Sequence, residues 1–296
     1  MSAPKPIIRT ADIATPLSEM IESSIAFGYE HRGRFGDDPI AGSRAHAEFT
    51  TDTGSFSAHR RHDIEEAHEW AAGIYLLSSS YLLTGLARLL YNEMQLFAYQ
   101  VVARSVVECV AKAWWLDDTE ASMDERLARF YIDRLHNIEE MVSAERLPKA
   151  DLATKREQLI KRAARSGIDP KFDKNKKLIG FGETVKVGST GLAGRFFKAL
   201  GFEDGDLWYR RVSAVVHATP YGLLDFYKMT DIPGSELKEL LPSLSIEEVR
   251  LAVIVSTQAY LGAVEFDSWH FGWESERVAK YRQQLLVQMT SLTFEE

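Results

Sequence analysis

The residues best suited to chemistry lie between Asp206 and His217, in the segment DLWYRRVSAVVH. At about 100° per residue, a helix over this segment gathers its polar residues on one face and its apolar residues on the opposite face. The polar set is Asp206, Arg210, Ser213 and His217, and the apolar set is Trp208, Val212 and Val215. Histidine titrates near neutral pH and can move a proton, while arginine can hold two phosphate oxygens at once. This combination predicts phosphoryl chemistry, in particular metal-independent RNA cleavage by attack of a 2′-hydroxyl on the adjacent phosphate.

The same residues also have a purely structural interpretation. Asp206 and Arg210 are spaced as an i,i+4 ion pair on a helix surface, and His217 could interact with the carbonyl groups at its helix end. Arg211 lies to the side of the polar face. The sequence leaves open which arginine would contact phosphate, and helical geometry favours Arg210 because it shares the face of His217.

A second segment, YQVVARSVVECVAKAWWL (residues 99–116), predicts a helix that is apolar nearly all round. Polar residues recur on it at every fourth position: Gln100, Arg104, Glu108 and Lys112. Either this row reaches solvent through i,i+4 ion pairs, or it faces a polar cleft. In the second case Glu108 would orient Arg210 or His217. Cys109 stands among valines and is typical of a buried, unreactive residue.

Histidines and carboxylates also gather in HRRHDIEEAHEW (residues 59–70), where His59, His62 and His68 alternate with acids. His62 with Glu65 or Glu66 could supply two ligands to a metal, which leaves a metal enzyme built on residues 59–69 as a third hypothesis. There is no HExxH motif, and a charged helix start is the more ordinary interpretation. We therefore predict no metal site and no cofactor. The aromatic residues around His270 could stack on a base but are more typical of a packed core.

Helical periodicity dominates the chain from His62 onward. It predicts helices over residues 62–90, 91–117, 123–146, 151–166, 189–200, 205–218, 245–269 and 275–290. We predict an all-α helical bundle in one domain, residues 62–296, preceded by a partly irregular N-terminal extension and linker, residues 1–61. Within that extension only residues 11–28 have the pattern of a short helix. Gly201 follows a periodic segment and suits a helix end.

Composition and charge narrow the class of protein. The 296 residues are 45% hydrophobic and 26% charged, as in soluble globular proteins. The net charge of -8 excludes a uniformly basic nucleic-acid coat, yet residues 146–177 hold eleven basic and four acidic residues. This basic stretch could contact an anionic partner such as RNA, or it could be a solvated helix followed by a loop. A single cysteine excludes a disulfide framework and a cysteine-rich zinc site.

The location of the protein is predicted from two absences. No signal-peptide pattern opens the chain, and the longest uncharged run, Trp70 to Ala87, has 18 residues and contains three consecutive serines. A run of that length reaches only the lower limit of a membrane span, so a buried helix is the preferred interpretation. We expect a cytoplasmic protein with no membrane partner.

Two of these motifs resemble a bacterial helical family of unassigned function whose architecture is similar to that of the HEPN superfamily. They are the Arg104-x3-Glu108 helix that ends in Trp-Trp-Leu, and Tyr209-x3-Ser213-x2-Val-His217. The resemblance covers about residues 62–230. Many HEPN proteins are metal-independent endoribonucleases of toxin or phage-defence systems, with an Arg-x4–6-His motif at a dimer cleft. Arg210 and Arg211 both fit that motif with His217.

The resemblance implies specific roles. His217 would be the general acid and base, Arg210 or Arg211 the phosphate contact, and Ser213 and Glu108 supporting groups. Arg104 and Tyr209 would contact the substrate, and a homodimer would bring two such faces together. Other HEPN-like domains serve only as dimerisation or binding modules, so the alternative is a non-catalytic module that binds a protein partner or a small ligand in the same cleft.

Overall fold

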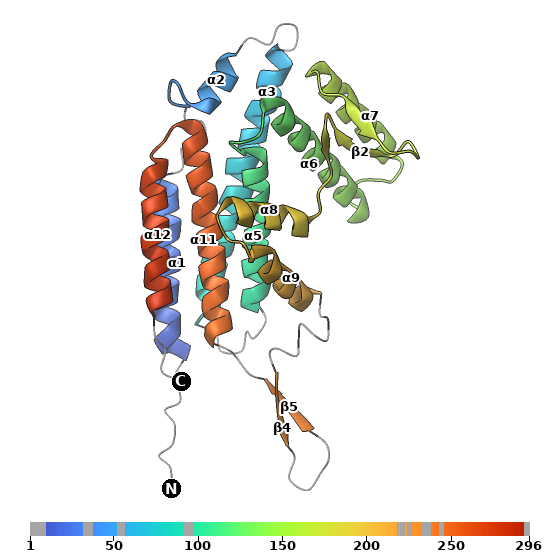
Figure 1. Cartoon of the computed structure of the whole chain (residues 1–296). Coiled ribbons are helices and arrows are strands. Elements are labelled where there is room, and N and C mark those ends of the chain that lie inside the picture. The colour runs from blue at the N-terminus through green and yellow to red at the C-terminus, as the bar shows by residue number, and fades with distance from the viewer. Residues whose placement is uncertain are drawn as a thin grey trace, which may run out of the picture.

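The computed structural model describes residues 10–31, 38–51, 57–91, 98–217, 219, 223, 227–231, 238–242 and 246–292. Most of these residues are helical, and the strands are short (Figure 1). The predicted all-α helical bundle is confirmed.

Long helices lying side by side form the main body of the bundle. They are α1 (Thr10–His31), α4 (Leu77–Leu89), α5 (Ala98–Leu116), α11 (Ile246–Phe271) and α12 (Ser275–Ser291) (Figure 1). Helix α5 packs against both α4 and α11, and its valines at positions 106, 107 and 110 are fully buried. Helix α1 packs against α4, α11 and α12 and buries Leu17 and Ile21 completely. Residues of the predicted N-terminal extension thus contribute a helix to the core.

One continuous helical run connects α3 (Ser57–His68) to α4 through a π-helix, η2 (Glu69–Leu76). The uncharged segment from Trp70 to Ala87 falls within this run. Its Leu76, Leu83 and Leu86 are buried, whereas Tyr81 is 66% exposed, as in an amphipathic core helix.

Helix α11 is long and apolar enough to cross a membrane by length and composition. Two-thirds of its most apolar window is buried inside the protein (67%), where it contacts α5 and α12. This burial is what a core helix of a bundle requires.

A side layer contains the basic stretch. It consists of α6 (Met123–Ser143), α7 (Asp151–Arg165) and a three-stranded antiparallel sheet, β1 (Pro170–Phe172), β2 (Leu178–Phe181) and β3 (Thr184–Val185). The expected loop after the basic helix is a tight β1–β2 connection, in which the Asp173 carboxylate accepts hydrogen bonds from the amides of Asn175 and Lys177. Such local bonds stabilise turns that strand periodicity cannot predict.

Helices α8 (Ser189–Ala199) and α9 (Gly205–Val216) form a hairpin that packs on α5. Gly201 has φ +82°, and the amides of Gly201 and Phe202 donate to the carbonyls of Lys198 and Phe197. This is a Schellman motif, which confirms Gly201 as the end of the helix. At Gly205 a Cβ atom would lie 2.3 Å from Phe197, so glycine allows the close approach of the two helices.

The remaining elements lie at the two ends of the bundle. Helix α2 (Arg44–Thr50) lies near one end, beside the start of α3, and the antiparallel hairpin of β4 (Tyr227–Asp231) and β5 (Lys238–Pro242) lies near the other (Figure 1). Ser43 caps α2, because its hydroxyl accepts a hydrogen bond from the His46 amide.

Candidate functional sites

The predicted catalytic residues lie on and next to α9, in the expected facial arrangement. Arg210 and His217 are exposed, Asp206 and Ser213 are half-buried, and Val212 and Val215 are buried on the opposite side. His217 is the C-cap of the helix, where its backbone amide donates to the Ser213 carbonyl. We call Asp206, Arg210, Ser213 and His217 the α9 face.

Three other predicted residues meet beneath this face, between α5 and α9. Tyr209 is fully buried, and its hydroxyl donates to Glu108 Oε1. Arg104 Nε lies 3.0 Å from the same oxygen, and its guanidinium stands over the Tyr209 ring at 5.5 Å. Burial, and then the Glu108 carboxylate, raise the pKa of Tyr209 to about 12, so it remains a hydrogen-bond donor at neutral pH. We call these residues the α5–α9 contact.

The α5–α9 contact changes the expected role of Glu108. Of the two alternatives for the polar row of α5, a polar cleft would let Glu108 orient Arg210 or His217, whereas its carboxylate is engaged by Tyr209 and by Arg104 in an i,i+4 ion pair. Tyr209 turns toward α5 and Arg210 toward solvent, so the two sets diverge. Within the described part of the chain, Glu108 therefore joins two helices and has no contact with the α9 face.

The two candidate arginines have different surroundings. Arg210 Nη2 lies 3.6 Å from Asp206 Oδ2, and its side chain is 66% exposed. Arg211 Nη2 lies 2.9 Å from Glu248 Oε1 on α11, and its side chain is 44% exposed. Arg211 is thus tied to the neighbouring helix, while Arg210 has the freer guanidinium.

A hollow of about 500 Å³ opens beside α9, between α8, α9 and α11. Its lining is mainly apolar and includes Phe197, Trp208, Leu251 and Ile254, while its charged members are Arg211, Glu203 and Asp204. A mostly apolar hollow with a few polar groups is typical of small-molecule sites.

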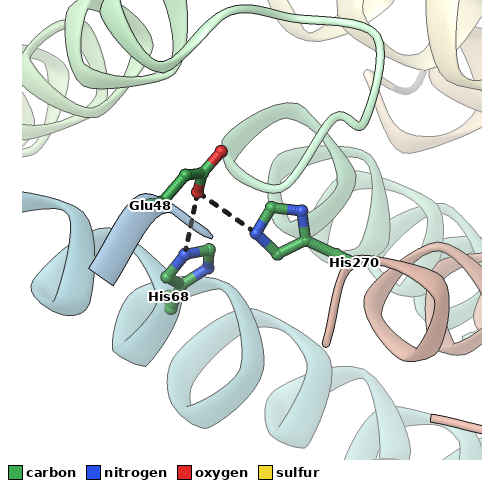
Figure 2. A group of neighbouring side chains, drawn as sticks. All are labelled: Glu48, His68 and His270. Carbon is green, nitrogen blue, oxygen red and sulfur yellow. Dashed lines mark ion pairs between the residues drawn. The ribbon is translucent and has the colours of Figure 1, made fainter. Parts of the chain in front are cut away.

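The most concentrated chemistry lies elsewhere, in a buried cluster near the α2 end of the bundle. Figure 2 shows Glu48 of α2 beside two imidazoles, those of His68 at the end of α3 and His270 near the end of α11. Glu48 Oε2 lies 3.8 Å from His68 Nε2 and 3.5 Å from His270 Nε2. All three residues are at most 8% exposed.

Two further residues complete this cluster. Asp117, in the connection after α5, lies with its Oδ1 2.5 Å from His68 Nδ1. Arg126 of α6 is fully buried; it forms an ion pair with Glu48 and lies 3.0 Å from His270 Nε2. We call Glu48, His68, Asp117, Arg126 and His270 the buried histidine–carboxylate cluster.

The protonation states in this cluster follow from its charges. Burial opposes the charged form of His68, but the Asp117 carboxylate outweighs it and raises the pKa of His68 to about 9. Burial lowers the pKa of His270 to about 4, so this imidazole is neutral at neutral pH. Burial opposes ionisation of Glu48, yet His270, His68 and Arg126 together hold its pKa well below the usual range. The Glu48 and Asp117 carboxylates therefore face the Arg126 guanidinium and the protonated His68.

In the sequence His68 and His270 belong to two separate candidate segments, and the other three members were not predicted as site residues. Glu48 falls in the polar segment that the sequence predicts as a connection, and Asp117 and Arg126 are ordinary charges beside helix ends. The members come from four helices and one connection, spread over most of the chain. The order of residues offers no common signal, since His68 falls inside the predicted helix 62–90 and His270 directly follows the predicted helix 245–269.

The basic stretch is partly neutralised within the fold. Arg162 pairs with Asp63 of α3, with Nη2 2.5 Å from Oδ1, and Arg156 and Lys186 both pair with Glu139 at 2.6 Å. Lys155 and Arg165 remain exposed at a hollow of about 380 Å³ between α6 and α7. Arg156 and Arg162 of this stretch thus stabilise the packing of α7 against α6 and α3.

Comparisons with protein-family models, with curated proteins and with solved structures found no match for this chain. The proposals below therefore depend on the geometry and chemistry of the residues described above.

Proposed function

We propose that the α9 face contacts RNA and cleaves it without a metal, with His217 as the general acid and base and Arg210 as the phosphate contact. The observation that carries this proposal is the joint exposure of Arg210 and His217 on one side of α9. A histidine that can move a proton and a guanidinium that can bind non-bridging oxygens are the two groups such a reaction needs. Arg211 supports the fold through Glu248 and takes no part in the reaction.

A homodimer is part of this proposal. The α9 face of one chain presents one exposed histidine, His217, and one exposed arginine, Arg210, on an open helix surface. A second copy related by a two-fold axis would place an identical face opposite the first, since such interfaces are self-complementary. The two faces would then line a cleft that accommodates one RNA strand.

The experiment is RNA cleavage by the purified protein in excess EDTA. We expect His217→Ala and Arg210→Ala to lower the cleavage rate by about 100-fold or more, as for loss of a general acid and base or a phosphate contact. Arg211→Ala should change the rate only a few-fold. His59→Ala removes an exposed histidine of α3 and serves as the matched control. Cleavage that persists in His217→Ala, or that stops in EDTA, contradicts the proposal.

A second candidate function is supported by the hollow beside α9. Its mainly apolar lining suits a small apolar ligand, bound without catalysis. Native mass spectrometry of the purified protein should then detect a bound small molecule, and Leu251→Trp should displace it by filling the hollow. Detection of the ligand, together with no RNA cleavage, would favour this binding module.

A further inference from the structure

We propose that Glu48, His68 and His270 bind one divalent transition-metal ion, zinc or ferrous iron. Each offers one donor atom, and the three atoms lie within 4.8 Å of one another. Metal–ligand bonds of about 2.1 Å at tetrahedral angles place neighbouring donors about 3.4 Å apart. The observed separations of 3.5 and 3.8 Å from Glu48 Oε2 need only a small contraction.

His68 is oriented for this role. Its Nδ1 faces the Asp117 carboxylate, so the Nε2 atom points toward Glu48 (Figure 2). Within the described part of the chain His68 Nε2 has no hydrogen-bond partner, although the residue is only 5% exposed. A buried nitrogen without a hydrogen bond requires an explanation, and a role as a metal ligand is one. A carboxylate on the far nitrogen is the usual second partner of a metal-bound histidine.

The donor set selects the metal. Two imidazoles and one carboxylate suit zinc and ferrous iron, whereas magnesium and calcium prefer oxygen ligands. Three protein donors leave a fourth position for water or another small ligand. The wider helical turn of η2 begins at Glu69, directly after His68, and π-helical turns often occur at functional sites.

Arg126 occupies the place that the ion would take. Its guanidinium contacts Glu48 Oε2 and His270 Nε2, which are two of the three proposed donors. In the metal-free protein Arg126 supplies the positive charge that the Glu48 carboxylate requires. When the ion binds, Arg126 must release these two atoms and the His68 imidazolium must lose its Nε2 proton to solvent, so Arg126 and a proton both compete with the metal.

The test is metal uptake by protein prepared in EDTA, freed of the chelator, and refolded with Zn²⁺, Fe²⁺ or Co²⁺ so that burial does not limit access. Fe²⁺ is handled anaerobically, and bound metal is measured by elemental analysis after gel filtration. We expect about one equivalent per chain, a rise in melting temperature, and the intense visible absorption of four-coordinate Co²⁺. Because nitrogen and oxygen sites generally bind Zn²⁺ more tightly than Fe²⁺, the metal found in protein purified without added metal distinguishes the two.

Four variants separate this site from its alternatives. His68→Gln and His270→Gln should lose the bound equivalent, and Asp117→Asn should bind about 10–100-fold more weakly. Arg126→Met should bind about tenfold more tightly, because a charge-assisted hydrogen bond no longer has to be broken. His62→Gln is the matched control, since His62 lies on the same helix in a second group, with Asp63 and Glu66, that could also hold a metal.

Three results would overturn the proposal. They are no retained metal after refolding, the weak absorption of six-coordinate Co²⁺, or loss of the metal in His62→Gln. Where a cluster variant fails to fold, X-ray absorption of the wild-type zinc or iron form provides the count of imidazole ligands. Two imidazoles support the site, and none or one contradicts it.

Discussion

The α9 face and the buried histidine–carboxylate cluster contain similar residue types in opposite environments. The α9 face presents a carboxylate, an arginine and a histidine to solvent along one helix, with an ion pair of 3.6 Å. The buried cluster encloses the same kinds of group from four helices and one connection, with Asp117 Oδ1 2.5 Å from His68 Nδ1. Exposed charges interact weakly through water, whereas buried charges must be paired. The first region is therefore free to bind a partner, while the second also stabilises the fold.

The largest expected effect on stability comes from Arg126→Met. This substitution leaves the buried Glu48 carboxylate without its nearest cation and should lower the free energy of unfolding by about 3–5 kcal/mol. Urea denaturation measures the change. The double variant Glu48→Gln/Arg126→Met should recover part of the loss, because the Asp117–His68 pair stays balanced. A loss below about 1 kcal/mol would show that the cluster is not a buried charge network.

The pH dependence of unfolding should reveal the two histidines of the cluster. For His68 the folded pKa is raised to about 9, so its contribution is complete below pH 6.5 and is lost as pH rises through 9. For His270 the folded pKa is lowered to about 4, so stability falls as pH drops from 6.5 toward 4. Metal-free protein in EDTA should therefore be most stable near pH 6.5, between the acid loss at His270 and the alkaline loss at His68.

This pH profile has a matched control. His68→Gln should flatten the alkaline slope, which amounts to about 3 kcal/mol or less, whereas the exposed His62→Gln should retain it. A profile that is unchanged by His68→Gln contradicts the assigned pairing with Asp117.

A smaller effect is expected at the α5–α9 contact. Tyr209→Phe removes a buried hydrogen bond to Glu108, whose carboxylate keeps Arg104, and should cost about 1–2 kcal/mol of unfolding free energy. Tyr81→Phe is the control, because Tyr81 is 66% exposed, and it should leave the free energy of unfolding unchanged. If Tyr209→Phe lowers RNA cleavage without lowering stability, Tyr209 contacts substrate, as the sequence predicts.

The smallest effect on stability belongs to the α9 face. His217→Ala and Arg210→Ala should each change the free energy of unfolding by less than about 0.5 kcal/mol, because both side chains are exposed. The same variants should abolish the proposed RNA cleavage. A large loss of stability in either would mean that the face is covered in solution, as by a second copy, and analytical ultracentrifugation would then show whether the dimer is lost.

Much of the local structure could be predicted from residue order. The helix that contains the α9 face, the apolar α5 and the helix end at Gly201 all follow from patterns within a few turns. The helix predicted over residues 11–28 is observed as α1, whereas α2 was not predicted, because it has only seven residues and lies in a polar segment. The sequence identifies Arg104, Glu108 and Tyr209 as site residues, but it does not show that the three contact one another.

The sequence alone determined the helical class of this protein and the side of α9 on which Arg210 and His217 stand, since both depend on a repeat of 3.6 residues. Tertiary structure alone decided that Arg211 is tied to Glu248 on α11, and that Glu48, His68 and His270 share one buried site. Those contacts join segments far apart in the chain, and burial changes their charges. Their chemistry could not be inferred from spacing along one helix.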